Sequence, residues 1–149
     1  MNLNEALKIL HEAGLTTDRM TAYHISRHKF DKFKLSEDND GMGTSFYGFG
    51  LYFTLDKDII EYYKDQMGEP YVVYQVELDS SKFINEYDEE YGLDFYGNMV
   101  EELGSEVKAT KLMLKKGITG MTYHSPEDGS SVIVYNPKVI LDMKIIEEA

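Results

Sequence analysis

The sequence predicts an α+β fold in a single domain over residues 1–149. Alternating apolar residues indicate several short strands, and most of these strands are joined by loops, which disfavours a doubly wound parallel sheet. Amphipathic helical segments gather near the start and in the middle of the chain. With 149 residues, of which 42% are hydrophobic, the chain is long enough to bury one core.

In the first half of the chain, helical and strand patterns surround a polar loop. A helix is expected within residues 1–15, because an apolar stripe runs from Leu3 to Leu10 and Gly14 ends it. The other expected elements are a strand at 21–26, a polar loop at 31–47, a strand at 49–54, a short helix at 56–64 and a strand at 71–78.

The second half begins with an acidic and aromatic stretch at 86–96, which we expect to be a surface insertion. Ser105 is suited to cap a helix that runs to Lys116 and stops at Gly117. Strands are then expected at 118–123, at 131–136 and from Val139 to Ile145, with Asn136-Pro137 breaking the chain before the last.

Composition excludes several classes of function. The formal net charge of −12 disfavours binding to nucleic acid or to anionic membranes. The absence of cysteine excludes disulfides, thiolate catalysis and cysteine-ligated zinc. Of the four histidines, His24 and His28 are four residues apart, but the pattern around them indicates a strand followed by a loop rather than a helix, which disfavours a metal site. No apolar run approaches a membrane span and the N-terminus lacks a signal pattern, so we expect a cytoplasmic protein.

The most informative segment is 48–63, in which two glycines open a strand and a short helix closes it. Tyr52 lies on the strand, and Tyr63 follows eleven residues later, about two helical turns past the strand–helix turn. Aromatic faces so spaced can enclose one planar ring, at ~0.5–1.5 kcal/mol each beyond burial. The alternatives are a glycine turn that enters a buried strand, and Tyr62 rather than Tyr63 facing inward.

Polar groups also end the strand at 21–26, in the run Tyr23-His24-Ile25-Ser26. A neutral His24 offers one donor and one acceptor, which suits a ribose hydroxyl, and the backbone of Ile25 can bind an amide edge-on. The alternative is a core histidine that is bonded to a backbone carbonyl.

A third polar cluster is the loop 127–131, directly before the last central strand. A carboxylate from Glu127 or Asp128 would lie at the mouth of that strand. The alternative is an acidic turn on an acidic protein.

Taken in order, these motifs resemble those of the ADP-ribosyltransferase superfamily. The chain has a histidine on an early strand, Gly-x-Gly-x-Tyr-Phe with a helical tyrosine downstream, and a late strand ending in Tyr-Asn-Pro. The likeness is to the diphtheria-toxin and poly-ADP-ribose polymerase branch and its small phage-encoded relatives, and it covers about residues 21–146. It implies two small mixed or antiparallel sheets, with a few helices, around a cleft for nicotinamide adenine dinucleotide (NAD).

The resemblance implies that NAD is the substrate and that no metal takes part. It implies that His24 binds the ribose next to nicotinamide, that the Ile25 backbone holds the carboxamide, and that the nicotinamide lies between Tyr52 and Tyr63. Arg27 or Lys29 is expected to neutralise the diphosphate. The expected NAD-binding residues are therefore Tyr23, His24, Ile25, Ser26, Arg27, Tyr52, Phe53 and Tyr63.

Three positions depart from the family pattern. Ile25 stands where a glycine is usual, Ile60 where a small residue is common, and Ser131 fills the slot of the family's glutamate. A carboxylate ~5 Å from a developing cation gains about 3 kcal/mol at an effective dielectric of ~20, or roughly two decades of rate. We expect Glu127 or Asp128 to supply this charge, with Glu127 preferred for its reach.

The sequence therefore predicts a mono-ADP-ribosyltransferase whose catalytic set comprises His24, Tyr52, Glu127, Asp128 and Ser131. The likeness to phage proteins implies an effector that modifies a host or defence protein in the host cytoplasm. Two alternatives stay open: an NAD glycohydrolase, and an inactive descendant that acts as a binding or inhibitory protein through its acidic surface. An RNA 2′-phosphotransferase is disfavoured, because RNA phosphates require a basic surface.

Overall fold

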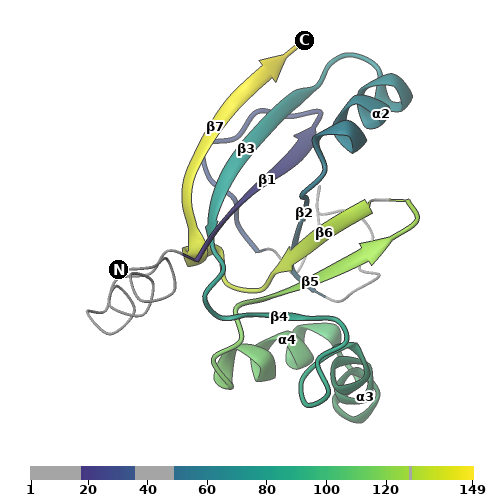
Figure 1. The fold of residues 1–149 in the computed structure, drawn as a ribbon, viewed down its shortest axis with the longest axis vertical. Helices are drawn as coiled ribbons and strands as arrows, with labels where there is room; N and C mark the ends of the chain where they lie inside the picture. The colour runs from purple at the N-terminus through teal and green to yellow at the C-terminus, as the bar shows by residue number, and fades with distance from the viewer. Residues whose placement is uncertain (1–17, 36–48, 128) are drawn as a thin grey trace, which may run out of the picture.

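The computed structural model describes residues 18–35, 49–127 and 129–149. Over these residues the fold is α+β, with three helices and one seven-stranded mixed sheet (Figure 1), which confirms the predicted class. The helix predicted within residues 1–15, most of the loop predicted at 31–47, and Asp128 lie outside the described residues.

The strands of the sheet are β1 (Arg19–Ser26), β2 (Leu51–Thr54), β3 (Val72–Asp79), β4 (Phe83–Asn85), β5 (Gly120–Ser125), β6 (Gly129–Val134) and β7 (Ile140–Glu148). They are ordered β4-β5-β6-β2-β1-β3-β7, and only the β4–β5 pair is parallel. A 3-10 turn at Pro137–Val139, capped by the side chain of Asn136, separates β6 from β7 where the sequence predicts a break.

The sheet is nearly divided between β1 and β2. These two strands pair only through Tyr23 and Thr54, whereas β1 pairs with β3 over all eight of its residues and β2 with β6 over all four. The resemblance implies a pair of small sheets, whereas here this one pair of residues joins the two halves into a single sheet. Figure 1 shows β1, β3 and β7 diverging from β2, β6 and β5.

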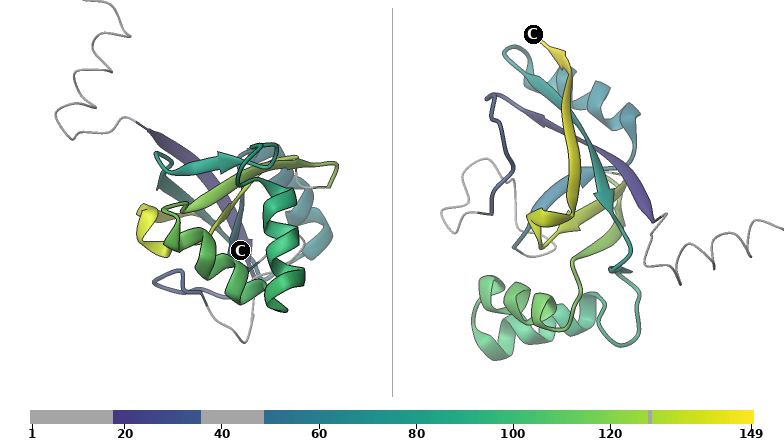
Figure 2. Two further views of the ribbon diagram at one scale, coloured as in Figure 1. Left: turned by 90° about the horizontal axis from the view of Figure 1, so that it is seen from below. Right: turned by 90° about the vertical axis from the view of Figure 1, so that its left-hand side faces the viewer.

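The described helices are α2 (Lys57–Met67), α3 (Leu93–Leu103) and α4 (Glu106–Lys115). Asp56 caps α2, and Ser105 caps α4 through the Lys108 N–H as the sequence predicts. α2 lies against β1 and β2, while α3 and α4 lie side by side at the opposite end of the molecule (Figures 1 and 2).

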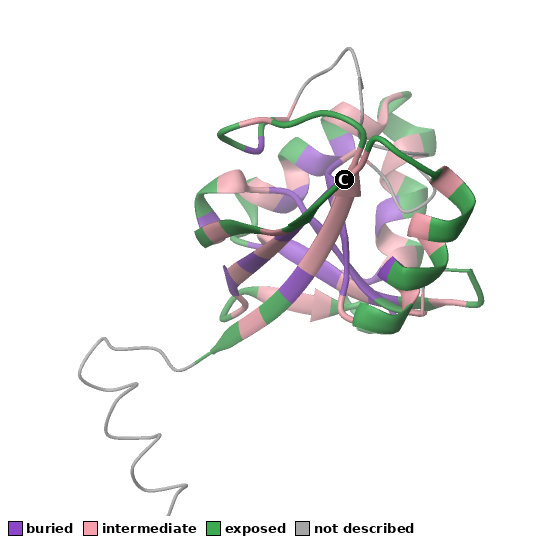
Figure 3. Cartoon of the chain, turned by 90° about the horizontal axis from the view of Figure 1, so that it is seen from above, coloured by how far each residue is buried: buried purple, intermediate pink, exposed green. Residues whose placement is uncertain are grey.

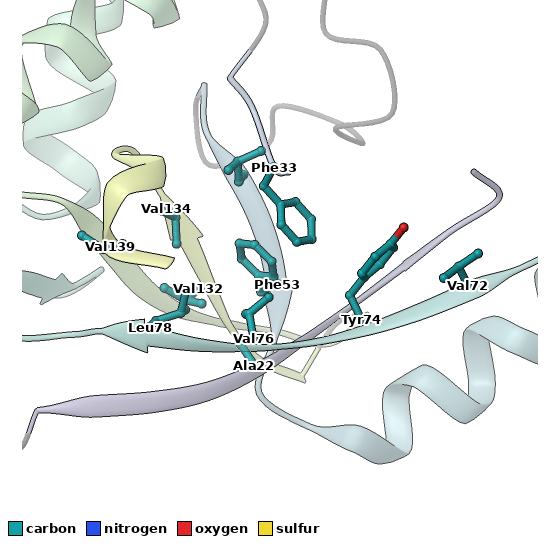
Figure 4. Close-up of a cluster of buried hydrophobic side chains, with 11 residues drawn as sticks. Ala22, Phe33, Phe53, Val72, Tyr74, Val76, Leu78, Val132, Val134 and Val139 are labelled. Carbon is teal, nitrogen blue, oxygen red and sulfur yellow. The ribbon is translucent and has the colours of Figure 1, made fainter. Parts of the chain in front are cut away.

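Two hydrophobic clusters lie on opposite faces of the sheet, because neighbouring side chains on a strand alternate. The first includes Phe33, Phe53, Tyr74, Val76 and Leu78, and Figure 4 shows Phe33 directed toward Phe53 and Tyr74. The second includes Tyr96, Met113, Met121, Ile133 and Tyr135, and it lies against α3 and α4. Figure 3 shows the central strands buried and the outer surfaces of the helices exposed.

The segment 86–96 differs from the predicted surface insertion. Glu86 and Tyr96 are only 7% and 3% exposed, and α3 begins inside the segment at Leu93. The aromatic residues explain the difference, because Tyr96 packs into the second cluster instead of facing solvent. Residues 87–90 remain on the surface.

Candidate functional site

His24 lies where β1 and β2 separate. Its Nδ1 is 3.1 Å from the carbonyl oxygen of Tyr52, so a neutral ring donates from Nδ1 and presents Nε2 as an acceptor. The imidazole also makes edge-to-face contacts with Phe30, Phe33 and Phe53, at centroid distances of 6.3, 5.4 and 5.9 Å. These contacts fix the orientation of the imidazole.

The surroundings of His24 favour its neutral form. Burial lowers its pKa below the ordinary value of 6.5, and the hydrogen bond to the Tyr52 carbonyl offsets part of that effect. The residue nevertheless retains some accessible surface. At neutral pH it is therefore an uncharged ring with an acceptor nitrogen. The core-histidine interpretation holds for Nδ1 and leaves the role of Nε2 open.

The neighbours of His24 lie at the end of the β1–β2 ladder. Ile25 and Ser26 still pair with β3, through Val73 and Val72, but the pairing with β2 has ended at Tyr23. A primary carboxamide carries donors and an acceptor, as a strand edge does, so it can bind a backbone at such a position. The role of the Ile25 backbone stays a prediction.

Tyr52 and Tyr63 belong to β2 and α2 respectively. The Tyr52 ring meets Tyr123 edge-on at 6.4 Å, and Tyr63 meets Tyr62 at 5.9 Å. Tyr62 is 56% exposed while Tyr63 is half-buried, which favours Tyr63 as the inward-facing ring. Ile60 is 3% exposed, so it packs in the interior beneath α2.

The basic residues beside His24 already have partners. The Nη2 group of Arg27 donates to the carbonyl of Met67 at 2.6 Å, near the C-terminus of α2, where a cation is favoured. Lys29 forms an exposed ion pair with Glu148 at 3.5 Å. These contacts hold the segment after β1 against α2 and the end of β7.

The slot of the family glutamate holds a buried hydroxyl. Ser131 is 1% exposed, pairs with Thr54 across β2 and β6, and donates to the carbonyl of Gly129 at 3.3 Å. Glu127 is exposed just before β6. Ser131 therefore supplies no carboxylate at the position of the family's glutamate.

Asp56 is a carboxylate near this slot that no sequence motif singles out as a site residue. Its Oδ1 accepts the N–H of Asp58 at 2.9 Å, and its Oδ2 lies 3.5 Å from the position of a Cβ added to Gly129. The Leu55 N–H donates to the carbonyl of Ser130 at 2.8 Å, which holds this turn against the start of β6. In the sequence, Asp56 carries only the signal of a helix cap. Its proximity to β6 arises from tertiary structure and could not be seen there.

The sequence matches no protein-family model, and no curated protein matches it significantly. Within residues 18–35, 49–127 and 129–149, no helix combines the length and apolar character needed to cross a bilayer. Over the same ranges, no group of three or more His, Cys, Asp or Glu side chains is arranged to hold a metal ion.

Proposed function

We propose that this protein is a mono-ADP-ribosyltransferase with an ADP-ribosyltransferase-like NAD cleft between the two halves of its sheet. The observation that carries the proposal is the hydrogen bond from the His24 ring to the Tyr52 carbonyl, across 28 residues of sequence. It joins the two motifs of the resemblance at the point where the β1–β2 ladder ends.

The binding roles follow from the local chemistry. The Nε2 atom of His24 accepts a hydrogen bond from a hydroxyl of the nicotinamide-side ribose. The backbone of Ile25 binds the carboxamide, and Tyr52 and Tyr63 enclose the pyridinium ring. The neutral state of His24 supports the first role, and the greater burial of Tyr63 than of Tyr62 supports the third.

The reaction breaks the bond between C1′ of the ribose and the ring nitrogen of nicotinamide. The bonding electrons leave with nicotinamide, which becomes neutral, and the ribose passes through an oxocarbenium-like state. A nucleophilic side chain of the acceptor protein then bonds to C1′ and loses its proton. Holding NAD in one orientation supplies part of the acceleration.

A carboxylate near C1′ would stabilise this state, and Ser131 provides none. We assign the role to Glu127, which is exposed two residues before β6; its neighbour Asp128 is the second candidate. Asp56 is a third, because its Oδ2 lies near Gly129 at the start of the same strand.

The acceptor that we propose is a host or defence protein. A formal charge of −12 disfavours nucleic acid and favours a basic protein surface as the partner.

An inactive binding or inhibitory protein is the second candidate, and the buried hydroxyl of Ser131 favours it. An NAD glycohydrolase would use the same site with water as the acceptor. The reaction products separate this activity from transfer to a protein.

The proposal is tested by measuring nicotinamide release from NAD and by incubating labelled NAD with a host lysate. We expect one labelled protein band, and at least an about tenfold loss of release in His24→Ala and in Tyr52→Ala, from loss of a ~1.4 kcal/mol contact. Tyr62→Ala is the matched control and should retain activity, since Tyr62 is exposed. Unchanged release in both site variants would contradict the catalytic assignment, whereas NAD binding by calorimetry without turnover would favour the inactive protein.

A further inference from the structure

A closed ring of hydrogen bonds holds both backbone groups of Phe49. The Phe49 N–H donates to Tyr96 Oη at 3.0 Å, Tyr96 Oη lies 2.6 Å from Thr110 Oγ1, and Thr110 donates to the Phe49 carbonyl at 2.6 Å. Each hydroxyl has one proton, so the ring closes when Tyr96 donates to Thr110. Tyr96 and Thr110 are 3% and 2% exposed, and such a buried, satisfied network holds its members rigidly.

The helices that supply this ring are themselves fixed. Tyr96, on α3, stacks on Tyr135 at 5.8 Å with an interplanar angle of 4°, and the Glu106 carbonyl on α4, 3.0 Å from its Oη, is an alternative acceptor for its single proton. Thr110 lies on α4, which packs against α3. The ring therefore fastens the chain before β2 to a rigid pair of helices.

Strand β2 needs this support because it is short and has little pairing on one side. It pairs with β6 along all four of its residues, but with β1 only through Thr54. Gly50, between Phe49 and β2, lies tight against β6, since an added Cβ would come within 2.5 Å of Ile133 Cγ1 and 2.9 Å of the Val134 carbonyl oxygen. The chain from Phe49 to Tyr52 is thus held by β6 and by the hydrogen-bond ring.

Tyr52 contributes twice to the site, through its phenol ring and through the carbonyl that binds His24. Both depend on the backbone of β2, which begins two residues after Phe49. A displacement of the Phe49 backbone would therefore move both the Tyr52 phenol and the Tyr52 carbonyl that accepts the hydrogen bond from His24.

We propose that Tyr96 and Thr110 are positioning residues of the NAD site, which act on Tyr52 through the backbone of Phe49. This inference rests on the proposed function. Neither side chain needs to touch the dinucleotide. Through this role α3 and α4, which lie at one end of the molecule, influence the NAD site at the centre of the sheet.

The test compares variants that differ by one hydroxyl or one methyl group. Thr110→Val and Tyr96→Phe each break the ring, and we expect the KM and the calorimetric Kd for NAD to rise about tenfold while kcat changes less than about threefold. Thr110→Ser keeps the hydroxyl and should restore both constants. Tyr135→Phe is the matched control, because it removes a buried phenol oxygen that makes no hydrogen bond within the described part of the chain.

Amide exchange at Phe49 reports the ring without any use of NAD, and it should accelerate in Thr110→Val and Tyr96→Phe but not in Tyr135→Phe. If wild-type protein binds and turns over NAD while Thr110→Val and Tyr135→Phe have the same KM, the positioning role is overturned and the proposed function stands. If wild-type protein neither binds nor uses NAD, the proposed function fails and the positioning role fails with it, whatever the exchange at Phe49 shows.

Discussion

At the scale of single residues, His24 forms a structural hydrogen bond through Nδ1, while the proposed contact with the ribose is made by Nε2. Its Nδ1 takes a backbone partner at the point where two strands part, and its aromatic neighbours exclude water from most of the ring. The same burial that supports the fold keeps the imidazole uncharged. Protonation should therefore weaken the fold and the proposed ribose contact together.

His24 makes stability depend on pH in a defined direction. Its folded pKa is lowered, so the folded state binds fewer protons than the unfolded state at pH values between the folded pKa and about 6.5. The contribution of the neutral His24 to the free energy of unfolding is complete above about pH 6.5, and it is lost as the pH falls through the folded pKa. We expect the urea midpoint to fall more between pH 7 and pH 5 in wild-type protein than in His24→Gln, as measured by circular dichroism. Equal falls would mean that His24 titrates alike in both states.

Three substitutions test the acid of the site. We expect Glu127→Gln to lower kcat for nicotinamide release by up to about a hundredfold, because about 3 kcal/mol of charge stabilisation is lost. Ser131→Ala should change kcat less than about threefold, since its hydroxyl is buried and bonded within the chain. Asp56→Asn keeps a capping side chain without the charge. A larger loss in Asp56→Asn than in Glu127→Gln would transfer the role to Asp56.

Residue by residue, the sequence was most informative where local pattern and chemistry coincide. The strand positions of His24 and Tyr52, and the cap at Ser105, follow from periodicity and side-chain type. The bond of Arg27 to the Met67 carbonyl and the position of Asp56 beside Gly129 could not be predicted, because they depend on how α2 lies against the sheet. The binding roles of these residues remain predictions.

At the scale of elements, the glycine before β2 is required by packing. Gly50 is buried, and a methyl group there would meet Ile133 and the carbonyl oxygen of Val134 at less than 3.0 Å. The Gly-x-Gly pattern is therefore explained at its second glycine by close approach of two strands, which is one of the standard uses of glycine in a sheet.

Gly50→Ala should destabilise the protein by about 1–3 kcal/mol, because the buried Ile133 side chain and the Val134 carbonyl oxygen leave no room for the added methyl group. For a chain of this size we expect the melting temperature to fall by roughly 2–10 °C. Gly97→Ala is the control, since Gly97 lies inside α3 with no atom within 4 Å of the added methyl. That change should stabilise by about 0.5–1 kcal/mol, and equal melting temperatures for the two variants would contradict the packing argument.

Elements with a strong local pattern were predicted, and those without one were not. β1, β3, β5 and α4 appear close to their expected bounds because alternation or a cap marks them. β4 has only three residues and pairs in parallel with β5, so little in its sequence signals a strand. α3 has an interior glycine and an acidic, aromatic composition that conceal a helix.

At the scale of the whole molecule, ion pairs and backbone hydrogen bonds fasten one end of the half-sheet that carries β1, where β3 begins and β7 ends. Lys64 on α2 bonds both Glu61 and Glu147, and Tyr71 exchanges two backbone hydrogen bonds with Ala149. The other half is fastened by α3 and α4 through Phe49. Between them only Tyr23 and Thr54 pair, so each half is better fixed within itself than to the other.

A ligand that binds between such halves should protect both of them at once. We expect saturating NAD to slow amide exchange at residues 24–26 of β1 and 51–54 of β2 together, by up to about a hundredfold at a ligand concentration of about 100 Kd. β4, which is the edge strand of the sheet beyond β5, should show little change, and it serves as the internal control in the same mass-spectrometric experiment. His24→Ala should abolish the protection of both segments, because each depends on the ribose contact. Protection confined to one strand would mean that NAD binds one half alone, and the proposed cleft between the halves would then be wrong.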